Sequence, residues 1–284
     1  MREGLIRSLK EAAYASGSIS VVSVDAVQRL AGLHGMPVHE VELAALEARV
    51  LPVRYERNLG TVGWEGQAKL LRSAVAVIGA GGLGGYVIEA LARMGVGRLI
   101  VVDADVFEDH NLNRQLMCTE STLRRPKVEV ARDRVRAVNS AVEVVTHQVR
   151  ATDDNMDSLI AGADVVVDAL DTLPSRFALQ RAARRLRVPM VHGAIAGYLA
   201  QIMTVFPDDD GLERIYGAGD VPEKGVETIL GNPAATPMLC AAWQVQEVIK
   251  LILNVGKPLR HRLLCIDAES GSVDVITWET GESR

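Results

Sequence analysis

Four groups of residues suited to binding phosphate follow one another between positions 79 and 127. The first is a glycine-rich run directly after an apolar stretch, where backbone N–H groups and a helix N-terminus can approach a phosphate. Asp103 follows about 20 positions later, where a dinucleotide-binding unit has the acid that holds a ribose hydroxyl. The pattern predicts a nucleotide site formed by Gly79, Gly81, Gly82, Gly84, Asp103, Asn111, Asn113, Arg114, Gln115 and Lys127.

Two cations in this group, Arg114 and Lys127, indicate which nucleotide chemistry to expect. NAD carries only a pyrophosphate, which a helix N-terminus largely holds by itself. Lys127 follows Pro126 in the first turn of a predicted helix, where the helix dipole disfavours a cation. A lone Arg or Lys is usually a solvated surface charge, but a polyphosphate ligand explains both cations together. The sequence therefore favours cleavage of an ATP phosphate bond over redox chemistry.

Two carboxylates, Asp168 and Asp171, flank the end of the apolar run 165–167. In an open α/β sheet the ligand crevice lies at the carboxyl ends of the strands. Because Mg²⁺ prefers a few carboxylates together with phosphate and water, we expect Asp171 to position magnesium. Thr172 is predicted to cap the next helix and to lie at the nucleotide.

The elements that must position these residues alternate between strand and helix. Apolar runs predict buried strands at 74–78, 99–102, 142–149, 163–170 and 189–195. Helical spacing of apolar residues predicts helices from 83, from 126 and over 173–186. A strand at 197–206, a helix at 238–254 and a strand pair at 261–267 and 272–278 complete the order. We expect a Rossmann-like, doubly wound, mostly parallel α/β sheet with an antiparallel C-terminal extension.

The chain divides into a small helical appendage, residues 1–53, and a main domain, residues 54–284. Ser23 is the predicted N-cap of a helix that ends near Gly35, and Pro37 opens a second helix. This resembles a helix-turn-helix, but residues 1–50 hold five basic and six acidic side chains, which disfavours DNA binding. The long acidic segment at about 207–237 is expected to be a lid or binding loop that crosses over the sheet.

Composition limits the class of protein. The chain is 48% hydrophobic and 24% charged with a net charge of −5, so we expect a folded protein with no general affinity for nucleic acid. No apolar run has the length of a signal peptide or a membrane span, and a cytoplasmic enzyme is expected. Cys118, Cys240 and Cys265 provide neither a disulfide framework nor a paired zinc motif.

Taken together, several runs resemble the ThiF/MoeB/HesA family, bacterial relatives of ubiquitin-activating enzymes. The resemblance extends from about Arg54 to Trp278, and its motifs are highly specific in combination. They are 54–58 (Arg-Tyr-Glu-Arg-Asn), the glycine loop 79–84, Asp103, the polar run 111–115, 126–129 (Pro-Lys-Val-Glu) and 168–171.

The resemblance implies a homodimeric adenylyltransferase that uses Mg-ATP. Its substrate would be the C-terminal glycine carboxylate of a ubiquitin-like sulfur-carrier protein ending in Gly-Gly, which it converts into an acyl adenylate. By this resemblance the glycine loop lies under the nucleotide and Asp103 holds the ribose. Asn111, Arg114 and Lys127 grip the phosphates, and Asp171 positions Mg²⁺. Arg57 would reach a phosphate from the partner subunit.

The chain departs from the family pattern in three respects. It lacks the two Cys-x-x-Cys pairs that hold zinc in many members, so we predict no zinc. Where members that bond covalently to their carrier have a crossover-loop cysteine, it has Glu227-Thr228, which predicts an enzyme that stops at the adenylate. Cys240 is expected to be a core residue, while a reactive role for Cys118 stays open. Thr172 replaces a frequent Asn, which puts one nucleotide contact in doubt.

Three other functions remain open at this point. The same fold could adenylate a peptide or a small or RNA-linked carboxylate. An NAD-dependent oxidoreductase is the alternative from a different class. A non-enzymatic scaffold that retains the nucleotide site is the third.

Overall fold

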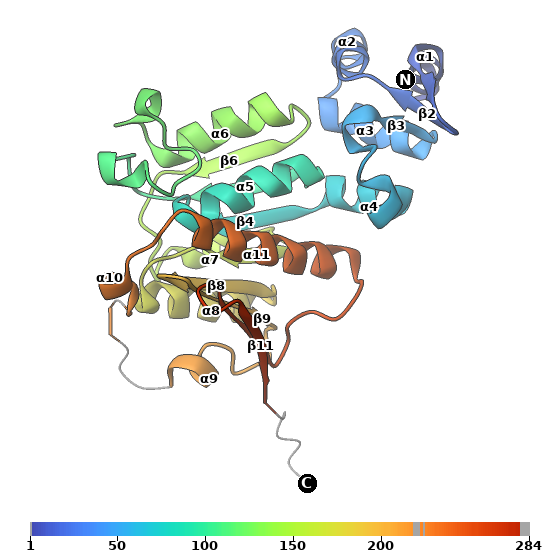
Figure 1. The fold of residues 1–284 in the computed structure, drawn as a ribbon. Coiled ribbons are helices and arrows are strands. Elements are labelled where there is room, and N and C mark those ends of the chain that lie inside the picture. Colours follow the sequence, from blue (N-terminus) through green and yellow to red (C-terminus); the bar gives the residue numbers. More distant parts are fainter. Residues whose placement is uncertain (1, 218–221, 224, 279–284) are drawn as a thin grey trace.

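The computed structural model describes residues 2–217, 222, 223 and 225–278. Its main sheet has eight strands with the spatial order β11-β10-β9-β8-β7-β4-β5-β6 (Figure 1). In chain order the strands are β4 (Ala74–Ile78), β5 (Arg98–Val102), β6 (Glu143–His147), β7 (Val165–Asp168), β8 (Met190–Ala196), β9 (Leu199–Val205), β10 (Arg262–Asp267) and β11 (Ser272–Thr277).

The sheet has a parallel part and an antiparallel part. Strands β6, β5, β4, β7 and β8 pair in parallel, whereas β9, β10 and β11 add to β8 in antiparallel fashion. β4 is the first strand of the main sheet along the chain. Strands β5 and β6 follow on one side of it, and β7 and the later strands lie on the other side. The strand order therefore reverses between β4 and β7, where α/β sheets bind ligands. The predicted fold class is confirmed.

Helices cover both faces of the parallel part (Figure 1). On one face lie α5 (Gly82–Met94), α6 (Lys127–Val138) and α11 (Ala235–Leu253), and on the other lie α7 (Met156–Ile160) and α8 (Leu173–Leu186). Successive residues of β4 point to opposite faces, so Val75 and Val77 join the first core and Ala76 and Ile78 join the second. All five residues of β4 are buried, which explains why its sequence is continuously apolar.

The N-terminal module, residues 2–52, is not purely helical as predicted. It contains α1 (Arg2–Ala12), α2 (Val24–His34) and α3 (Val38–Glu47), but also a small sheet of β1 (Tyr14–Ser16), β2 (Ile19–Val22) and β3 (Val50–Pro52). The cap predictions are confirmed: Ser23 Oγ accepts a hydrogen bond from Ala26 N at 3.2 Å, and Gly35 ends α2 with a φ of 62°. Such short strands carry too little periodicity to be recognised in sequence.

A buried polar network joins this module to the main domain. Glu42 of α3 is fully buried and forms an ion pair with Arg54 Nε at 3.1 Å. Tyr55 donates its hydroxyl hydrogen to Glu42 at 2.8 Å, and Asn139 Nδ2 donates to the Tyr55 oxygen at 3.0 Å. Burying this carboxylate is tolerated because both a cation and a donor face it.

Other boundaries differ from the predictions. Helix α4 (Leu59–Arg72), which follows the 3-10 turn η1 (Val53–Tyr55), was not predicted, and α11 begins at Ala235 rather than 238. The predicted crossover segment holds two short helices, α9 (Glu213–Tyr216) and α10 (Glu227–Leu230). Its residues 218–221 and 224 lie outside the described part of the chain. None of the described helices is long and apolar enough to cross a membrane.

Candidate active site

A cavity of about 930 Å³ lies at the carboxyl ends of β4, β5, β7 and β8. Part of the crossover segment, including Tyr216 and Glu227, forms another wall. This volume is in the range of sites that take drug-sized and cofactor-sized ligands. Nine of the residues predicted from the sequence line it, namely Gly79, Gly81, Gly82, Asp103, Arg114, Gln115, Lys127, Asp171 and Thr172.

The glycine loop brings the backbone of α5 close to the cavity. Gly79 has a φ of +100°, and a Cβ there would lie 2.4 Å from the Ala169 carbonyl oxygen, so only glycine fits. Gly81 occupies the N-cap of α5 and has no side chain with which to cap the helix. The first amides of α5 are therefore available to an anion at the positive end of the helix dipole.

Gly84 does not line the cavity, and its contact with the cofactor stays a prediction. A Cβ at this position would lie 1.8 Å from the Gly79 carbonyl oxygen. Gly84 therefore lets the first turn of α5 pack against the strand-to-helix loop, and it acts on the shape of the loop.

Asp103 directly follows β5 and holds two backbone segments, the glycine loop and the start of its own loop. Its Oδ2 accepts from Ala80 N at 2.7 Å and its Oδ1 accepts from Asp105 N at 2.8 Å. Burial raises the pKa of Asp103, and the charge of Lys127 and these two amides oppose that shift. Each carboxylate oxygen has a further lone pair, so a ribose hydroxyl could still donate to it.

The two predicted cations reach the cavity from different elements. Lys127, in the first turn of α6, is only 6% exposed, and its Nζ lies 3.1 Å from Asp105 Oδ2. Arg114 lies on the loop between β5 and α6, where it donates to the His110 carbonyl at 3.0 Å and to Asn113 Oδ1 at 2.8 Å. Asp105 offsets part of the cost of this nearly buried ammonium in the first turn of a helix, and a polyphosphate would offset more of it.

Besides Gly84, three predicted site residues lie outside the cavity. Asn111 is 3% exposed, and its Oδ1 accepts from Glu108 N at 3.0 Å in a reciprocal capping box, so it shapes the turn that carries Arg114, and its contact with a phosphate stays a prediction. Asn113 Nδ2 donates to the Asn232 carbonyl at 3.3 Å and so joins this turn to the segment before α11. Arg57 is exposed and lies away from the cavity of its own chain.

The loop between β7 and α8 holds Asp171 and Thr172 at the cavity. Thr172 does occupy the N-cap position, but its Oγ1 donates to Ser175 Oγ at 2.8 Å, so the predicted side-chain cap is wrong. The amide of Leu173 donates instead to the Glu223 carbonyl at 3.2 Å, so the crossover segment satisfies the start of α8.

The cavity contains polar atoms that a nucleotide would pair. Gln115 Oε1 and Asn232 Oδ1 are buried atoms without a hydrogen-bond partner, and both residues line the cavity. Since buried polar groups are nearly always paired, a polar ligand fits here. Among the described residues, no three or more acidic, histidine or cysteine side chains are grouped so that they could hold a metal ion by themselves. A magnesium ion would therefore need phosphate and water in addition to Asp171.

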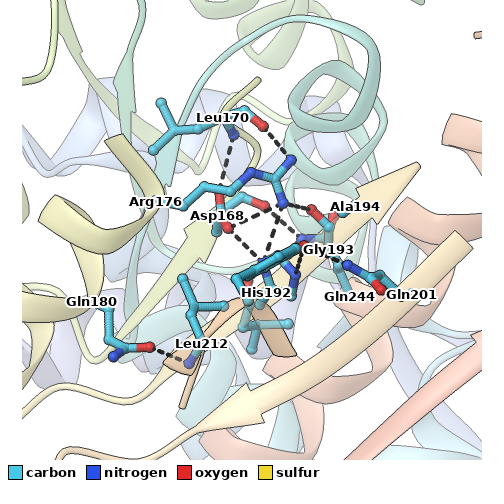
Figure 2. Close-up of polar contacts among 12 residues, drawn as sticks. Asp168, Leu170, Arg176, Gln180, His192, Gly193, Ala194, Gln201, Leu212 and Gln244 are labelled. Carbon is cyan, nitrogen blue, oxygen red and sulfur yellow. Dashed lines mark hydrogen bonds and ion pairs between the residues drawn. The ribbon is translucent and has the colours of Figure 1, made fainter. Parts of the chain in front are cut away.

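Sequence reasoning missed a buried polar cluster beneath this loop, which Figure 2 shows. Asp168, the last residue of β7, is fully buried and accepts from His192 Nδ1 at 2.7 Å, with Arg176 Nη1 3.6 Å away. Burial alone would raise the pKa of Asp168, but Arg176 and His192 hold that pKa below its ordinary value. These partners come from β7, α8 and β8, and their spacing along the chain does not predict that they are in contact.

The three cysteines are poor nucleophiles. Cys240 is fully buried in α11, and burial raises the pKa of its thiol to about 12, in agreement with the predicted core role. Burial also raises the pKa of Cys118, more than the charge of Lys127 lowers it. Cys265 of β10 lines the cavity, but burial and Asp274 raise its pKa too. All three therefore remain thiols near neutral pH.

Comparisons with known proteins agree with this geometry. The model of the ThiF family matches residues 55–282. The SAMP-activating enzyme E1 of Haloferax volcanii is 38% identical over 233 residues, which cover 80% of this chain and 85% of that protein. The sulfur carrier protein adenylyltransferase of Thermus thermophilus is 38% identical over 239 residues, covering 79% and 86%. The crystal structure of E. coli MccB with MccA-N7isoASN superposes with a TM-score of 0.69 at 22% identity, covering 81% of this chain and 73% of that chain.

Proposed function

The chain belongs to the ThiF family, and we propose that it is an adenylyltransferase that activates the C-terminal glycine carboxylate of a ubiquitin-like sulfur-carrier protein with ATP. The products are an acyl adenylate and pyrophosphate. The observation that carries the proposal is one cavity that combines the amino end of α5 with Arg114, Lys127 and Asp171. The two relatives at 38% identity are named for activating SAMP and for adenylating a sulfur carrier, which supports this substrate class.

The chemistry requires positioning more than proton transfer. A carboxylate is already a nucleophile, so its attack on the α-phosphate needs no general base. The cost lies in bringing two anions together and in the charge that develops on the departing pyrophosphate. The α5 amides, Arg114 and Lys127 would stabilise that charge. Asp171 would hold Mg²⁺, which when bound would neutralise further phosphate charge.

The wall opposite the glycine loop supports a narrow acceptor. Strands β8 and β9 line part of the cavity with Ala194, Ala196 and Ala200, beside the larger Ile195, Leu199 and Gln201. Small side chains leave room for an extended Gly-Gly terminus, which has no Cβ atoms of its own. An acceptor with larger side chains next to its C-terminal carboxylate would clash with this wall. Steric exclusion would therefore make the site selective for a glycine tail.

The catalytic unit is proposed to be a homodimer with Arg57 contributed to the partner's site. Leu116, which lies next to Gly85 of α5, and Met238 of α11 are both exposed apolar side chains. Apolar surface of this kind marks interaction sites. Arg57 is exposed and away from its own cavity, as a residue that acts across an interface must be.

A mixing experiment tests the trans role of Arg57. Subunits with Arg57→Ala and subunits with Asp171→Ala would each be inactive alone. Random reassociation should restore about a quarter of the wild-type rate, because half of the dimers are mixed and each mixed dimer has one complete site. An absence of recovery, with mixed dimers confirmed by native mass spectrometry, would exclude the trans role.

The reaction is proposed to end at the adenylate. In the crossover segment Glu227 and Thr228 stand at the start of α10, and no thiol lies there. Cys265 reaches the cavity, but its raised pKa leaves it protonated. Transfer of sulfur would then fall to a separate protein that accepts the activated carrier.

The deciding assay is ATP–pyrophosphate exchange with a purified sulfur carrier that ends in Gly-Gly, followed by intact-mass detection of a carrier-AMP adduct. The same carrier without its last glycine is the matched control. Exchange that depends on the terminal glycine supports the proposal. Exchange with a short peptide but not with the carrier would assign the peptide-modifying alternative instead.

A further inference from the structure

A chain of side-chain hydrogen bonds, part-buried at Gln201 and Tyr216 and fully buried at His192 and Asp168, runs from the cavity wall toward the loop that carries Asp171. It begins at Gln201 of β9, whose Nε2 donates to the Tyr216 hydroxyl. Tyr216 lies in α9, lines the cavity, and has its oxygen 3.4 Å from His192 Nε2. His192 Nδ1 lies 2.7 Å from Asp168 Oδ2. Figure 2 shows the part of this chain around Asp168 and His192.

The partners determine the direction of each hydrogen bond. The Asp168 carboxylate can only accept, so His192 Nδ1 carries the hydrogen and donates it. His192 Nε2 is then the acceptor for the Tyr216 hydroxyl. The ring is neutral in this arrangement, and burial indeed lowers the pKa of His192 despite the adjacent carboxylate. Every donor in the chain therefore has one acceptor, as a buried network requires.

Arg176 joins the same cluster to the loop at residues 169–172. Its guanidinium is 8% exposed, with Nη2 donating to the Leu170 carbonyl at 2.6 Å and Nη1 donating to the Gly193 carbonyl at 2.9 Å. Asp168 Oδ1 accepts from Leu170 N at 3.1 Å. Leu170, the residue just before Asp171, is thus held at its amide by Asp168 and at its carbonyl by Arg176.

We propose that Arg176 and His192 are positioning residues that fix the Asp171 loop for the metal-bound nucleotide. Through Tyr216, His192 also makes the order of that loop depend on α9 of the crossover segment. Only the first part rests on the function proposed above, because it assumes that Asp171 serves Mg-ATP. The dependence of the loop on Tyr216 is a property of the fold alone.

The arrangement gives the enzyme a way to sense its acceptor. The crossover segment forms part of the cavity wall, so an acceptor entering the cavity must contact it. A shift of α9 that lengthens the contact between Tyr216 and His192 would loosen the hold on Asp168 and hence on Leu170. Correct seating of the acceptor and correct placement of the metal are then favoured together, as two sites coupled through one buried element.

Hydrogen–deuterium exchange tests the coupling without any assumption about activity. Tyr216→Phe removes one hydroxyl but keeps the edge contacts of the ring with Phe177 and His192. We expect exchange in residues 168–173 to rise about five-fold, the effect of one lost hydrogen bond, with residues 74–78 unchanged. Tyr14→Phe, on the half-exposed strand β1, is the control. Equal protection of 168–173 in the Tyr216 variant and wild type would overturn the coupling.

A second variant separates the two bonds of the histidine. His192→Asn retains an N–H group that can donate to Asp168 but has no acceptor at the Nε2 position. It should therefore raise exchange in 168–173 to the same extent as Tyr216→Phe, and the double variant should add little more. Additive effects in the double variant would show that Tyr216 does not act through His192.

Nucleotide binding tests the positioning role. Arg176→Lys keeps a charge but cannot serve Leu170 and Gly193 together. We expect its Kd for the Mg²⁺ complex of a non-hydrolysable ATP analogue to rise about ten-fold, while its Kd for the metal-free analogue stays within about two-fold. Equal weakening of both would overturn the positioning role. Wild-type protein that binds neither form would refute the proposed function, whereas the exchange experiment would still decide the coupling.

Discussion

Replacing Arg114 by alanine should lower the rate of adenylation by about 10²–10³, the usual cost of losing one preorganised group that stabilises developing charge. The side chain lines the cavity, and its own hydrogen bonds hold it in place: Nη1 donates to the His110 carbonyl and to Asn113. Because Arg114 is half-exposed and has no buried ionic partner, stability should change by less than about 1 kcal/mol. The loss of rate should therefore appear in a protein that is folded.

The measurement is ATP–pyrophosphate exchange with saturating carrier, combined with thermal denaturation. Arg124→Ala is a matched control, since Arg124 lies on the same loop, pairs with Asp109 at 2.7 Å, and is exposed outside the cavity. Its exchange rate should stay within about two-fold of wild type, because an exposed ion pair contributes little. A near-normal exchange rate for Arg114→Ala would refute the assignment of this cation to the phosphates.

Three further predictions concern the glycine loop, the N-terminal network and the buried histidine. Gly84→Ala should lower the melting temperature by several degrees or prevent folding, because its Cβ would meet the Gly79 carbonyl oxygen, whereas Gly82→Ala, with its nearest neighbour at 3.7 Å, should keep the fold and weaken ATP binding. Glu42→Ala should cost about 3–5 kcal/mol in urea denaturation, since it leaves the Arg54 charge unpaired beside Tyr55; a loss below 1 kcal/mol would contradict that reading. The folded state lowers the pKa of His192, so its contribution to stability is present above the unfolded pKa of about 6.5 and is lost as the pH falls below it. His192→Asn should therefore flatten the decline in stability between about pH 7 and pH 5, as measured by denaturation at each pH, and an unchanged slope would count against it.

Features that depend on residues close together in the sequence can be predicted from it, whereas features that depend on distant residues cannot. The strand Ala74–Ile78 and the glycine loop were recognised because continuous apolar residues and a run of glycines act locally. Lys127 was recognised because its place after Pro126 contradicts the preference of a helix start. The structure brings these residues to one cavity, while their roles toward ATP remain proposals.

Asn111 has a structural role that local reasoning does not reveal. Its residue type suits phosphate binding, yet its side chain closes a capping box with Glu108 and is buried. An Asn side chain serves a turn or a ligand equally well, and only its surroundings decide between them. The same holds for Thr172, whose hydroxyl donates to Ser175 Oγ, while the first amide of α8 donates to the Glu223 carbonyl.

The order of the strands in the main domain, the position of the phosphate-binding loop and the cations that follow it can be read from the sequence, because each depends on neighbours within a few turns of chain. Only the tertiary structure decided that Asp168, Arg176, His192 and Tyr216 form one buried cluster under that site. These residues come from β7, α8, β8 and α9, and their types carry no signal apart from one another. Charge and hydrogen bonding make them a unit only when the sheet and the crossover segment bring them within 4 Å of each other and exclude water.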